Sequence, residues 1–233
     1  MLVMGLDTAT DIGAIGLIKN NNFLGEVNIC LQQRHSERLL ENIDYLLGEA
    51  GVDKKELSGL AVSLGPGSFT GLRIGLTCIK TMAQFLQIPV VGISTLELFA
   101  ASIADRDGLL LPLMDARHKR VYTALFQGGN DIKLEENRIW PDRTMKLEEL
   151  IVELKEVAAD KTVYLIGPGC PVYSAFLQKL NPNFVFPPIY NNVARGGVVA
   201  ARGKYYLQRD IQTDYHQLNP VYLKKAVHNT PGG

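Results

Sequence analysis

The sequence predicts an α/β protein of two lobes that repeat one plan, with a mixed sheet of parallel and antiparallel strands in each lobe. Apolar runs of strand length alternate with stretches whose apolar residues recur at helical spacing. Each half also contains antiparallel strands, a helix, a strand that ends in Gly-Pro-Gly (residues 65–67 and 167–169) and a further helix. A polar break then divides the chain into an N-terminal lobe over residues 1–105 and a C-terminal lobe over residues 106–233 with a loosely ordered tail.

The first lobe opens with an antiparallel meander. Three extended stretches, at residues 2–6, 12–18 and 23–31, are separated by short polar turns. The apolar period then becomes that of a helix, which Ser36 can cap at its start and Gly51 can end in a left-handed conformation.

The rest of this lobe follows the order strand, helix, strand, helix. A buried strand over residues 60–64 leads into the glycine-rich turn 65–71, in which Ser68 or Thr70 can cap the next helix. That helix runs to Gln87 and is followed by a strand over residues 89–93. Ser94 and Glu97 then form the pattern of a capping box, which predicts a helix to about residue 104.

The second lobe begins with a strand pair at residues 109–114 and 120–127, and residues 131–140 could add a third strand. An amphipathic helix is expected over residues 147–157, a strand over 163–166 and a helix over 172–180. The last predicted helix spans residues 193–208.

The charge balance argues against a protein that binds nucleic acid by itself. Lys and Arg number 24 and Asp and Glu number 24, so the formal net charge is zero, whereas such proteins usually carry a basic excess. The three cysteines are scattered, which favours a reducing compartment. The N-terminus lacks the basic start of a signal peptide, and no apolar run approaches the roughly 18 residues of a spanning helix. We therefore expect a soluble cytoplasmic protein with no membrane partner.

Two turns are candidates for phosphate binding. Asp7-Thr8-Ala9-Thr10 follows the first strand, where backbone N–H groups and hydroxyls can hold an anion, although Asp and Thr are also ordinary turn residues. The turn at residues 65–71 enters a helix, whose positive end favours an anion. It can equally be a tight turn without a ligand, and it is no Walker A loop because Leu72 follows Gly71.

Motifs for a metal or a nucleophile are missing from the sequence. The four histidines are never three to five residues apart, so no pair on one helix turn can bind a metal. No Gly-x-Ser-x-Gly elbow occurs. Residues 195–228 carry six basic side chains interleaved with tyrosines, which could contact RNA but are more typical of a solvated helix face and a packed tail.

Six segments together resemble one protein family. In chain order they are GLDTAT at residues 5–10, RHSERLL at 34–40, GPGSFTGLRIG at 65–75, GISTLE at 92–97, DAR at 115–117 and PVYL at 220–223. They are similar to motifs of the TsaB (YeaZ) family of the bacterial tRNA threonylcarbamoyladenosine pathway. The match covers almost the whole chain in order and is most specific at residues 65–75.

The resemblance implies a two-lobed, duplicated actin/Hsp70/hexokinase-like (ASKHA) fold, in agreement with the repeated halves. It also implies partnership with the catalytic paralogue TsaD and the ATPase TsaE. That complex moves a threonylcarbamoyl group from its adenylate to N6 of adenosine 37, in tRNAs that read codons beginning with A. The chain would meet tRNA through the complex.

The resemblance further implies that this chain is a non-catalytic scaffold or activator. In TsaD a His-x-x-x-His pair holds the catalytic metal, and the equivalent positions here are Thr95 and Phe99. A hydroxyl and a phenyl ring cannot replace two imidazoles as ligands. Asp7, Thr8 and Thr10 become remnants of an ancestral phosphate turn. No metal or cofactor of its own is expected, and any ATP or ADP would sit at the joint surface with TsaD.

The same resemblance implies a partner face on the first two helices, which pair with the same helices of TsaD. The residues expected on this face are His35, Ser36, Glu37, Leu39, Leu40, Ile43, Leu47, Thr70, Arg73, Leu76 and Lys80. The wide apolar arcs of both helices could equally pack on the chain's own sheet. If exposed, they would also permit a two-fold homodimer through this face. At the tail, Lys224 stands where the family often has an arginine, so a forked donor is lost there.

Two other functions stay open at this point. One is a small enzyme of the same fold, either using ATP or acting as a peptidase, since related proteins have carried a glycoprotease label. The other is an RNA-binding protein that acts alone through the basic C-terminal stretch.

Overall fold

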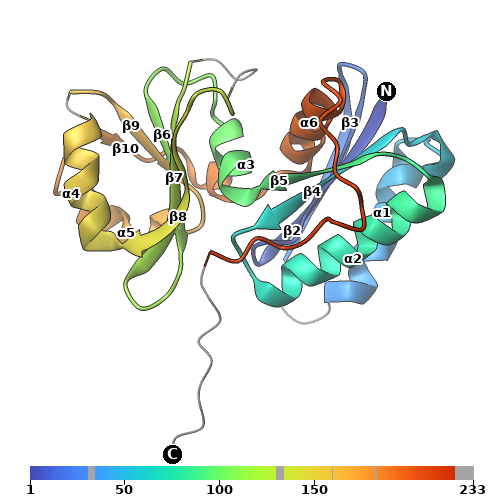
Figure 1. Ribbon diagram of the computed structural model, residues 1–233, viewed down its shortest axis with the longest axis horizontal. Coiled ribbons are helices and arrows are strands. Elements are labelled where there is room, and N and C mark those ends of the chain that lie inside the picture. The colour runs from blue at the N-terminus through green and yellow to red at the C-terminus, as the bar shows by residue number, and fades with distance from the viewer. Residues whose placement is uncertain (31–34, 130–133, 159, 182, 224–233) are drawn as a thin grey trace, which may run out of the picture.

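Two five-stranded sheets lie side by side in the computed structural model, and helices cover their faces (Figure 1). The structure describes residues 1–30, 35–129, 134–158, 160–181 and 183–223, without the side chains of residues 35–37. Sheet 1 consists of β1 (Leu2–Asp7), β2 (Ile12–Lys19), β3 (Asn22–Cys30), β4 (Gly59–Gly65) and β5 (Val90–Ser94). Sheet 2 consists of β6 (Leu109–Asp115), β7 (Arg120–Gln127), β8 (Arg138–Lys146), β9 (Val163–Ile166) and β10 (Phe184–Val185).

The two sheets share one topology. Sheet 1 has the order β3-β2-β1-β4-β5, and sheet 2 has the matching order β8-β7-β6-β9-β10. In each, the first three strands in sequence are antiparallel neighbours and the next two run parallel to the first. Both Gly-Pro-Gly turns begin with a glycine at positive φ, 109° for Gly65 and 114° for Gly167. The predicted duplication with mixed sheets is therefore confirmed.

The helices divide between the two lobes. The described α-helices are α1 (His35–Glu49), α2 (Phe69–Leu86), α3 (Thr95–Ala101), α4 (Leu147–Ala158), α5 (Cys170–Leu177) and α6 (Gly196–Leu207), with 3-10 turns at Lys54–Glu56 and Ile189–Asn192. Helices α1 and α2 cover one face of sheet 1, and α6 covers the other (Figure 1). Helices α4 and α5 cover the outer face of sheet 2.

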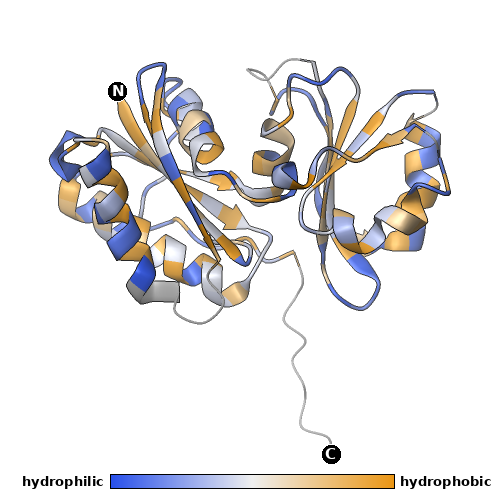
Figure 2. Ribbon diagram, turned by 180° about the vertical axis from the view of Figure 1, so that it is seen from behind, coloured by the Kyte–Doolittle hydropathy of each residue, from blue (hydrophilic) through white to orange (hydrophobic). Residues whose placement is uncertain are grey.

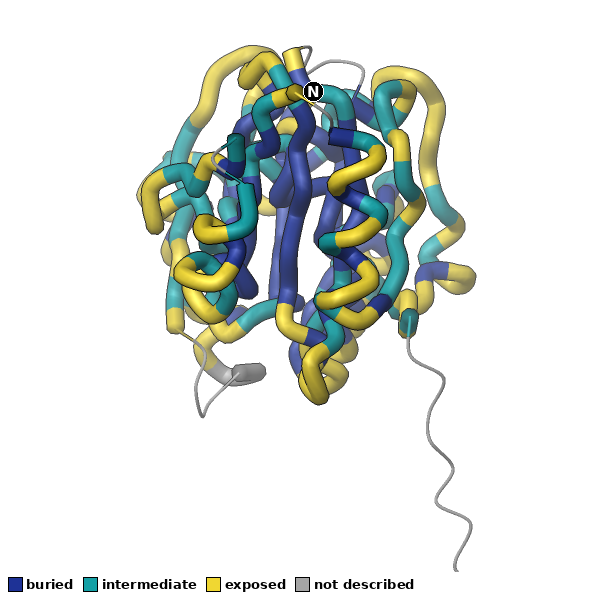
Figure 3. Tube along the Cα trace, turned by 90° about the vertical axis from the view of Figure 1, so that its left-hand side faces the viewer, coloured by how far each residue is buried: buried dark blue, intermediate teal, exposed yellow. Residues whose placement is uncertain are grey.

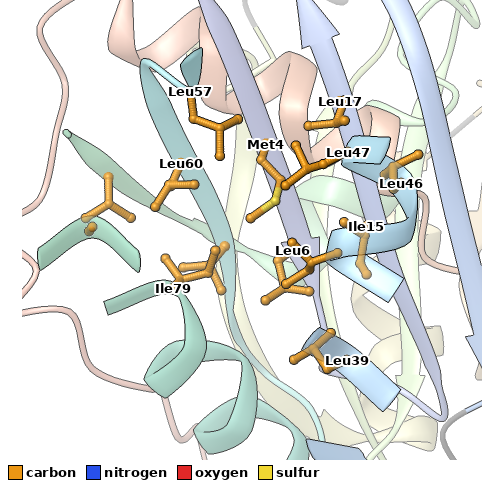
Figure 4. Packing of buried hydrophobic residues seen from close by; sticks show 14 of the residues in the cluster. Met4, Leu6, Ile15, Leu17, Leu39, Leu46, Leu47, Leu57, Leu60 and Ile79 are labelled. Atoms are coloured by element: carbon orange, nitrogen blue, oxygen red, sulfur yellow. The ribbon is translucent and has the colours of Figure 1, made fainter. Parts of the chain in front are cut away.

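The main core lies between sheet 1 and the pair α1 and α2. Figure 4 shows Met4, Leu6 and Ile15 from the strands meeting Leu39 and Ile79 from the helices. Apolar and polar residues alternate around these helices (Figure 2), which places one face in the core and the other in solvent. Seen from the second lobe, buried strands run between helices whose outer turns are exposed (Figure 3).

Helices α3 and α6 are equivalent in the duplicated plan, because each follows the last strand of its own sheet. Each one packs on the other lobe. Leu96, Phe99 and Ala100 of α3 join the core of sheet 2, whereas Val199, Tyr206 and Leu207 of α6 join Val3 and Ala61 of sheet 1.

This packing of α3 and α6 on each other's lobes, an exchange of helices, corrects the expected division of the chain. We expected residues 106–233 to form the second lobe, but α6 and the segment that follows it lie on the first. Residue Thr213 pairs with Val90 of β5, and Leu218 is buried in the main core. The reason is the close approach of α6 to β1 and β2, which glycines on both sides permit.

Several element boundaries differ from those predicted. The third strand of the second lobe is Arg138–Lys146, not residues 131–140. It is an edge strand with mixed exposure and contains Pro141, so it lacks an alternating pattern. Helix α5 begins at Cys170 and α3 ends at Ala101. The two-residue strand β10 was not predicted because so short a pairing leaves no period in the sequence.

Candidate functional site

The turn between β1 and β2 is closed by hydrogen bonds to itself and to the start of α2. The Thr8 hydroxyl donates to the Gly71 carbonyl at 2.8 Å, and the Ser68 N–H donates to the Ala9 carbonyl at 2.7 Å. The Asp7 carboxylate accepts the Ala9 N–H at 2.8 Å. The Thr10 hydroxyl donates to the Ile12 carbonyl at 3.0 Å. Asp7, Thr8 and Thr10 therefore lie together in one turn, and the side chain of each is hydrogen-bonded to a backbone group of the chain itself.

Two glycines of α2 make this contact possible. A Cβ added at Gly71 would lie 2.1 Å from the Thr8 carbonyl oxygen, and one at Gly75 would lie 2.2 Å from the Thr8 hydroxyl oxygen. Both distances are far inside van der Waals contact. Ser68 caps the helix by accepting the Gly71 N–H at 3.2 Å, so of the two predicted caps it is Ser68 that acts. Because the turn packs on the backbone of α2, the glycine-rich motif has a structural role whatever else it does.

Asp7 faces a small cavity between the two lobes. The cavity has a volume of about 10 Å³ and is lined by Asp7, by Leu98, Phe99 and Ser102 of α3 and its end, and by Val193, Ala194, Arg195 and Val199. A space of this size holds at most one water molecule. Burial raises the pKa of the Asp7 carboxyl to about 6, against the lowering effect of the hydrogen bond from the Ala9 N–H.

This raised pKa predicts a specific pH dependence of stability. The Asp7 carboxyl has a pKa of 3.8 when unperturbed and about 6 in the folded chain, so folded molecules hold a proton that unfolded ones release between these values. The contribution of Asp7 to the free energy of unfolding therefore falls as the pH rises from about 4 to about 6. We expect Asp7→Asn, which keeps an acceptor for Ala9, to gain up to about 3 kcal/mol at pH 7.5 and nothing at pH 4.

Urea unfolding of wild type and D7N from pH 4 to pH 8 measures this difference. Asp11→Asn removes a charge from an exposed position of the same turn and serves as the matched control. A D7N curve parallel to that of wild type across this range would contradict the prediction.

Thr95 and Phe99, which the family resemblance placed where a catalytic paralogue has a metal-binding histidine pair, both lie in the interior. Thr95 is 0% exposed and its hydroxyl oxygen has no hydrogen-bond partner among the described residues. Phe99 packs in the core of sheet 2 with Leu110 and Phe126. In the part of the chain that the structure describes, no three His, Cys, Asp or Glu side chains converge where they could hold a metal ion.

The expected partner face divides into exposed and buried residues. Leu40 is 57% exposed, and Thr70 and Arg73 are also exposed, while Lys80 is half-buried. Four other residues, Leu39, Ile43, Leu47 and Leu76, are at most 5% exposed and pack in the main core. They also line hollows at this face, so a partner could reach them only at the floor of a contact. The side chains of His35, Ser36 and Glu37, and the whole of Lys224, lie outside the described residues.

Two hollows flank Leu40 between α1 and α2. One has a volume of about 430 Å³ and a mostly apolar lining that includes Leu40, Ile74, Cys78 and Met82. The other has a volume of about 240 Å³ and includes Leu40, Met82 and Phe85. Phe85 is 74% exposed. Large exposed apolar side chains gathered around hollows are typical of a protein–protein contact.

Charge is also segregated across this face. Helix α2 contains Arg73 and Lys80 and no acidic residue. Among the described side chains of α1, Glu41, Asp44 and Glu49 outnumber Arg38. The apolar hollows thus lie between an acidic helix and a basic one, an arrangement that favours a partner with the opposite order of charges.

The sequence did not predict that the C-terminal segment would border this face. The Val221 N–H donates to the Leu64 carbonyl at 2.7 Å, and the Tyr222 ring stacks on Phe69 with centroids 5.2 Å apart. The Arg73 guanidinium lies over Phe69 at 3.9 Å and donates to the Tyr222 hydroxyl at 3.3 Å. The PVYL motif therefore joins the glycine-rich motif in space.

The capping-box prediction at Ser94 and Glu97 is half right. The Ser94 hydroxyl accepts the N–H groups of Leu96 and Glu97 at 3.2 and 3.3 Å. The Glu97 carboxylate instead meets Arg202 of α6 and Arg138 of β8. A glutamate at the third helical position is a local cap signal, so sequence reasoning assigned it locally and missed its long-range partners.

Most of the basic C-terminal stretch is engaged within the chain. Arg195 pairs with Glu26 at 2.6 Å, and Arg202 pairs with Glu97 at 3.0 Å. Lys204 donates to the Asn21 side-chain oxygen at 2.6 Å, and Arg209 lies over the Tyr205 ring at 3.6 Å. These contacts favour the interpretation as a packed helix over that of a free RNA-binding surface. None of the helices among the described residues has the length and apolar character needed to cross a membrane.

Comparisons with known proteins bear on the family and on the fold. The family model for TsaD, described as tRNA N6-adenosine threonylcarbamoyltransferase, matches residues 25–225. The tRNA threonylcarbamoyladenosine biosynthesis protein TsaB of Bacillus subtilis (strain 168) is 32% identical over 228 residues, which cover 97% of this chain and 95% of that protein. TsaB of Escherichia coli (strain K12) is 31% identical over 142 residues, which cover 60% of this chain and 58% of that protein.

Solved structures give the same fold. YeaZ from Pseudomonas aeruginosa matches with a TM-score of 0.77 and 24% identity, covering 95% of this chain and 99% of that one. The activator of 2-hydroxyisocaproyl-CoA dehydratase from Clostridium difficile, solved with bound ADPNP, matches with a TM-score of 0.52 and 10% identity over 92% of this chain and 99% of that one. These likenesses, with the duplicated sheets, confirm the ASKHA fold expected from the sequence.

Proposed function

The chain belongs to the TsaB family, and from this membership we propose that it takes part in forming N6-threonylcarbamoyladenosine in tRNA as a non-catalytic subunit. Its partners in this proposal are TsaD, which carries the chemistry, and TsaE, and it meets tRNA through their complex. The cytoplasm is the expected compartment, in keeping with three free cysteines among the described residues.

The burial of Thr95 and Phe99 supports the non-catalytic role. Both side chains are enclosed in the interior, at 0% and 3% exposure, and neither is of a type that replaces an imidazole ligand. The Phe99 ring packs in the core of sheet 2. A histidine at this position would be surrounded by apolar side chains, and several of these would have to move to make room for a metal ion.

The face of α1 and α2 supports partnership, and it is the observation that carries the proposal. Leu40 and Phe85, at 57% and 74% exposure, flank apolar hollows that the isolated chain leaves open to water. We propose that TsaD covers these hollows with its own equivalent helices. A second copy of this chain would present the same apolar and charged pattern, so homodimers through this face are expected when TsaD is absent.

A further part of the proposal is that the isolated chain takes no nucleotide into its cleft. The cavity that Asp7 faces has a volume of about 10 Å³ in the structure. We propose that ATP or ADP, where it takes part, lies at the joint surface with TsaD. In this proposal the chain differs from the fold relative whose structure contains ADPNP.

Reconstitution tests this function. The chain is mixed with TsaD, TsaE, tRNA, ATP and threonylcarbamoyl-adenylate, and modified adenosine is scored with and without the chain. We expect product only when the chain and TsaD are both present. The chain alone, given labelled ATP, is expected to retain none and to hydrolyse none.

Two results would contradict the proposal. If the chain alone modifies tRNA or turns over ATP, the non-catalytic role is wrong. If TsaD and TsaE give full product without the chain, the role as a necessary subunit is wrong.

A further inference from the structure

A cluster of charged side chains joins the two lobes at a place that the proposed function does not use. Its members come from three parts of the fold. Glu97 lies on α3, and Arg202 and Tyr206 lie on α6. Glu135 lies just before β8, and Arg138 is the first residue of that strand. Because α6 packs on sheet 1 and β8 belongs to sheet 2, the cluster spans the boundary between the lobes.

The contacts across the boundary are direct. Arg202 of the first lobe pairs with Glu135 of the second at 2.7 Å, and the Tyr205 hydroxyl donates to the same carboxylate at 2.6 Å. Glu97 then links both lobes, because it accepts from Arg202 at 3.0 Å and from Arg138 at 3.2 Å. The Tyr206 hydroxyl also donates a hydrogen bond to the Glu97 carboxylate, at 2.6 Å.

A second layer of contacts holds Arg138 in place. Its guanidinium also pairs with Asp142 of β8, and Asp142 in turn accepts the hydroxyl of Ser94, the cap of α3. The Arg138 guanidinium lies 4.5 Å over the Phe126 ring. The start of α3 and the edge of sheet 2 are thus joined by a continuous set of polar contacts.

Burial makes these contacts costly to break. The side chains of Arg202 and Glu97 are only 7% and 6% exposed, whereas those of Arg138 and Glu135 are 23% and 26% exposed. A buried charge that loses its partner keeps the cost of desolvation without the compensating attraction. A rotation of one lobe against the other would separate Arg202 from Glu135, so the buried guanidinium would lose one of its carboxylate partners.

The cluster lies at the meeting point of the two exchanged helices. Each of α3 and α6 packs on the sheet of the other lobe, and Glu97 and Arg202 are the charged pair between them. The cavity at Asp7 is lined by Leu98, Phe99 and Ser102 of the same α3 segment and by residues 193–195 that lead into α6. Any opening of the lobes would therefore enlarge this cavity and break the cluster together.

We propose that Glu97, Glu135, Arg138 and Arg202 form an ionic clamp that holds the cleft between the lobes closed without a bound ligand. The chain then presents its surfaces as one rigid body. This inference concerns the isolated chain and is independent of any partner.

Hydrogen exchange of the full chain tests the clamp. Glu135→Gln removes the charge that Arg202 meets across the boundary, and Tyr205→Phe removes only a hydroxyl from the same carboxylate. We expect E135Q to speed amide exchange about 10-fold at residues 98–102 and 193–195, with a smaller effect of Y205F, and no change within the strands. Glu153→Gln, which breaks the pair of Glu153 with Arg143 at 2.7 Å inside the second lobe, is the matched control.

The milder variant keeps the test informative if E135Q folds poorly. Exchange that rises equally in all strands would indicate general destabilisation and would overturn the clamp, as would unchanged exchange in both variants. Addition of ADPNP with Mg²⁺ to wild type is expected to leave exchange at these residues as it was. Slower exchange with ADPNP would mean that a ligand closes the lobes, and the clamp would again be wrong.

Discussion

Replacing Leu40 with aspartate is expected to lower the affinity of the chain for TsaD at least 100-fold. Leu40 lies between the two hollows of α1 and α2 and is 57% exposed, so it has room to enter a partner and little role in the chain's own core. The few residues that dominate a protein–protein interface each cost at least about 2 kcal/mol of binding free energy when they are truncated, and we expect Leu40 to be one of them. An aspartate there must also lose its water in the complex. Calorimetric titration of TsaD with wild type and L40D measures the difference.

A matched variant separates this effect from a general change of surface charge. Val152 lies on α4 of the second lobe and is 62% exposed, so Val152→Asp makes the same change far from the face. We expect V152D to bind TsaD like wild type, and both variants to melt at the temperature of wild type. If L40D keeps its affinity, the face of α1 and α2 is not where TsaD binds.

Leu39 and Leu40 show how far the sequence could define this face. They are adjacent leucines in one helix, yet Leu39 is 2% exposed and Leu40 is 57% exposed. Helix α1 carries apolar residues over so wide an arc that either could have faced the sheet. The sheet settles the rotation of the helix, because Met4, Leu6 and Ile15 offer an apolar surface to Leu39. Helical period thus predicted the helix but not which leucine a partner could reach.

The duplicated fold was predictable because its signals are local. Each Gly-Pro-Gly turn and each change of period from strand to helix acts over a few residues, and both halves repeat them. The exchange of α3 and α6 was not predictable in this way. It depends on contacts between β1, β2 and α6, which are far apart in the sequence and follow no period. The interlobe position of Glu97 was missed for the same reason, since its partners Arg138 and Arg202 lie 41 and 105 residues away.

Alanine at Gly16 is expected to destabilise the chain by about 3 kcal/mol, at the upper end of the range for overpacking. Gly16 of β2 pairs with Gly5 of β1, and both lie under α6. A Cβ at Gly16 would lie 2.1 Å from the carbonyl carbon of Gly196, and one at Gly5 would lie 2.2 Å from the amide nitrogen of Ala200. Backbone atoms cannot turn aside as a side chain can, so α6 must move off the sheet. The melting temperature should fall by about 10 °C.

Gly48→Ala provides the control for Gly16→Ala. Gly48 lies in α1 and has nothing within 4 Å of an added Cβ, so the same methyl group meets no obstacle there. Alanine is the better helix former by up to about 1 kcal/mol, and we expect G48A to be as stable as wild type or more so. Denaturant unfolding of both variants decides the matter, because the two substitutions are chemically identical and differ only in what they touch. Equal stability of G16A and wild type would mean that α6 does not pack directly on the backbone of β1 and β2. The close contact at Gly5, Gly16 and Gly196 would then not be what holds α6 on the first lobe.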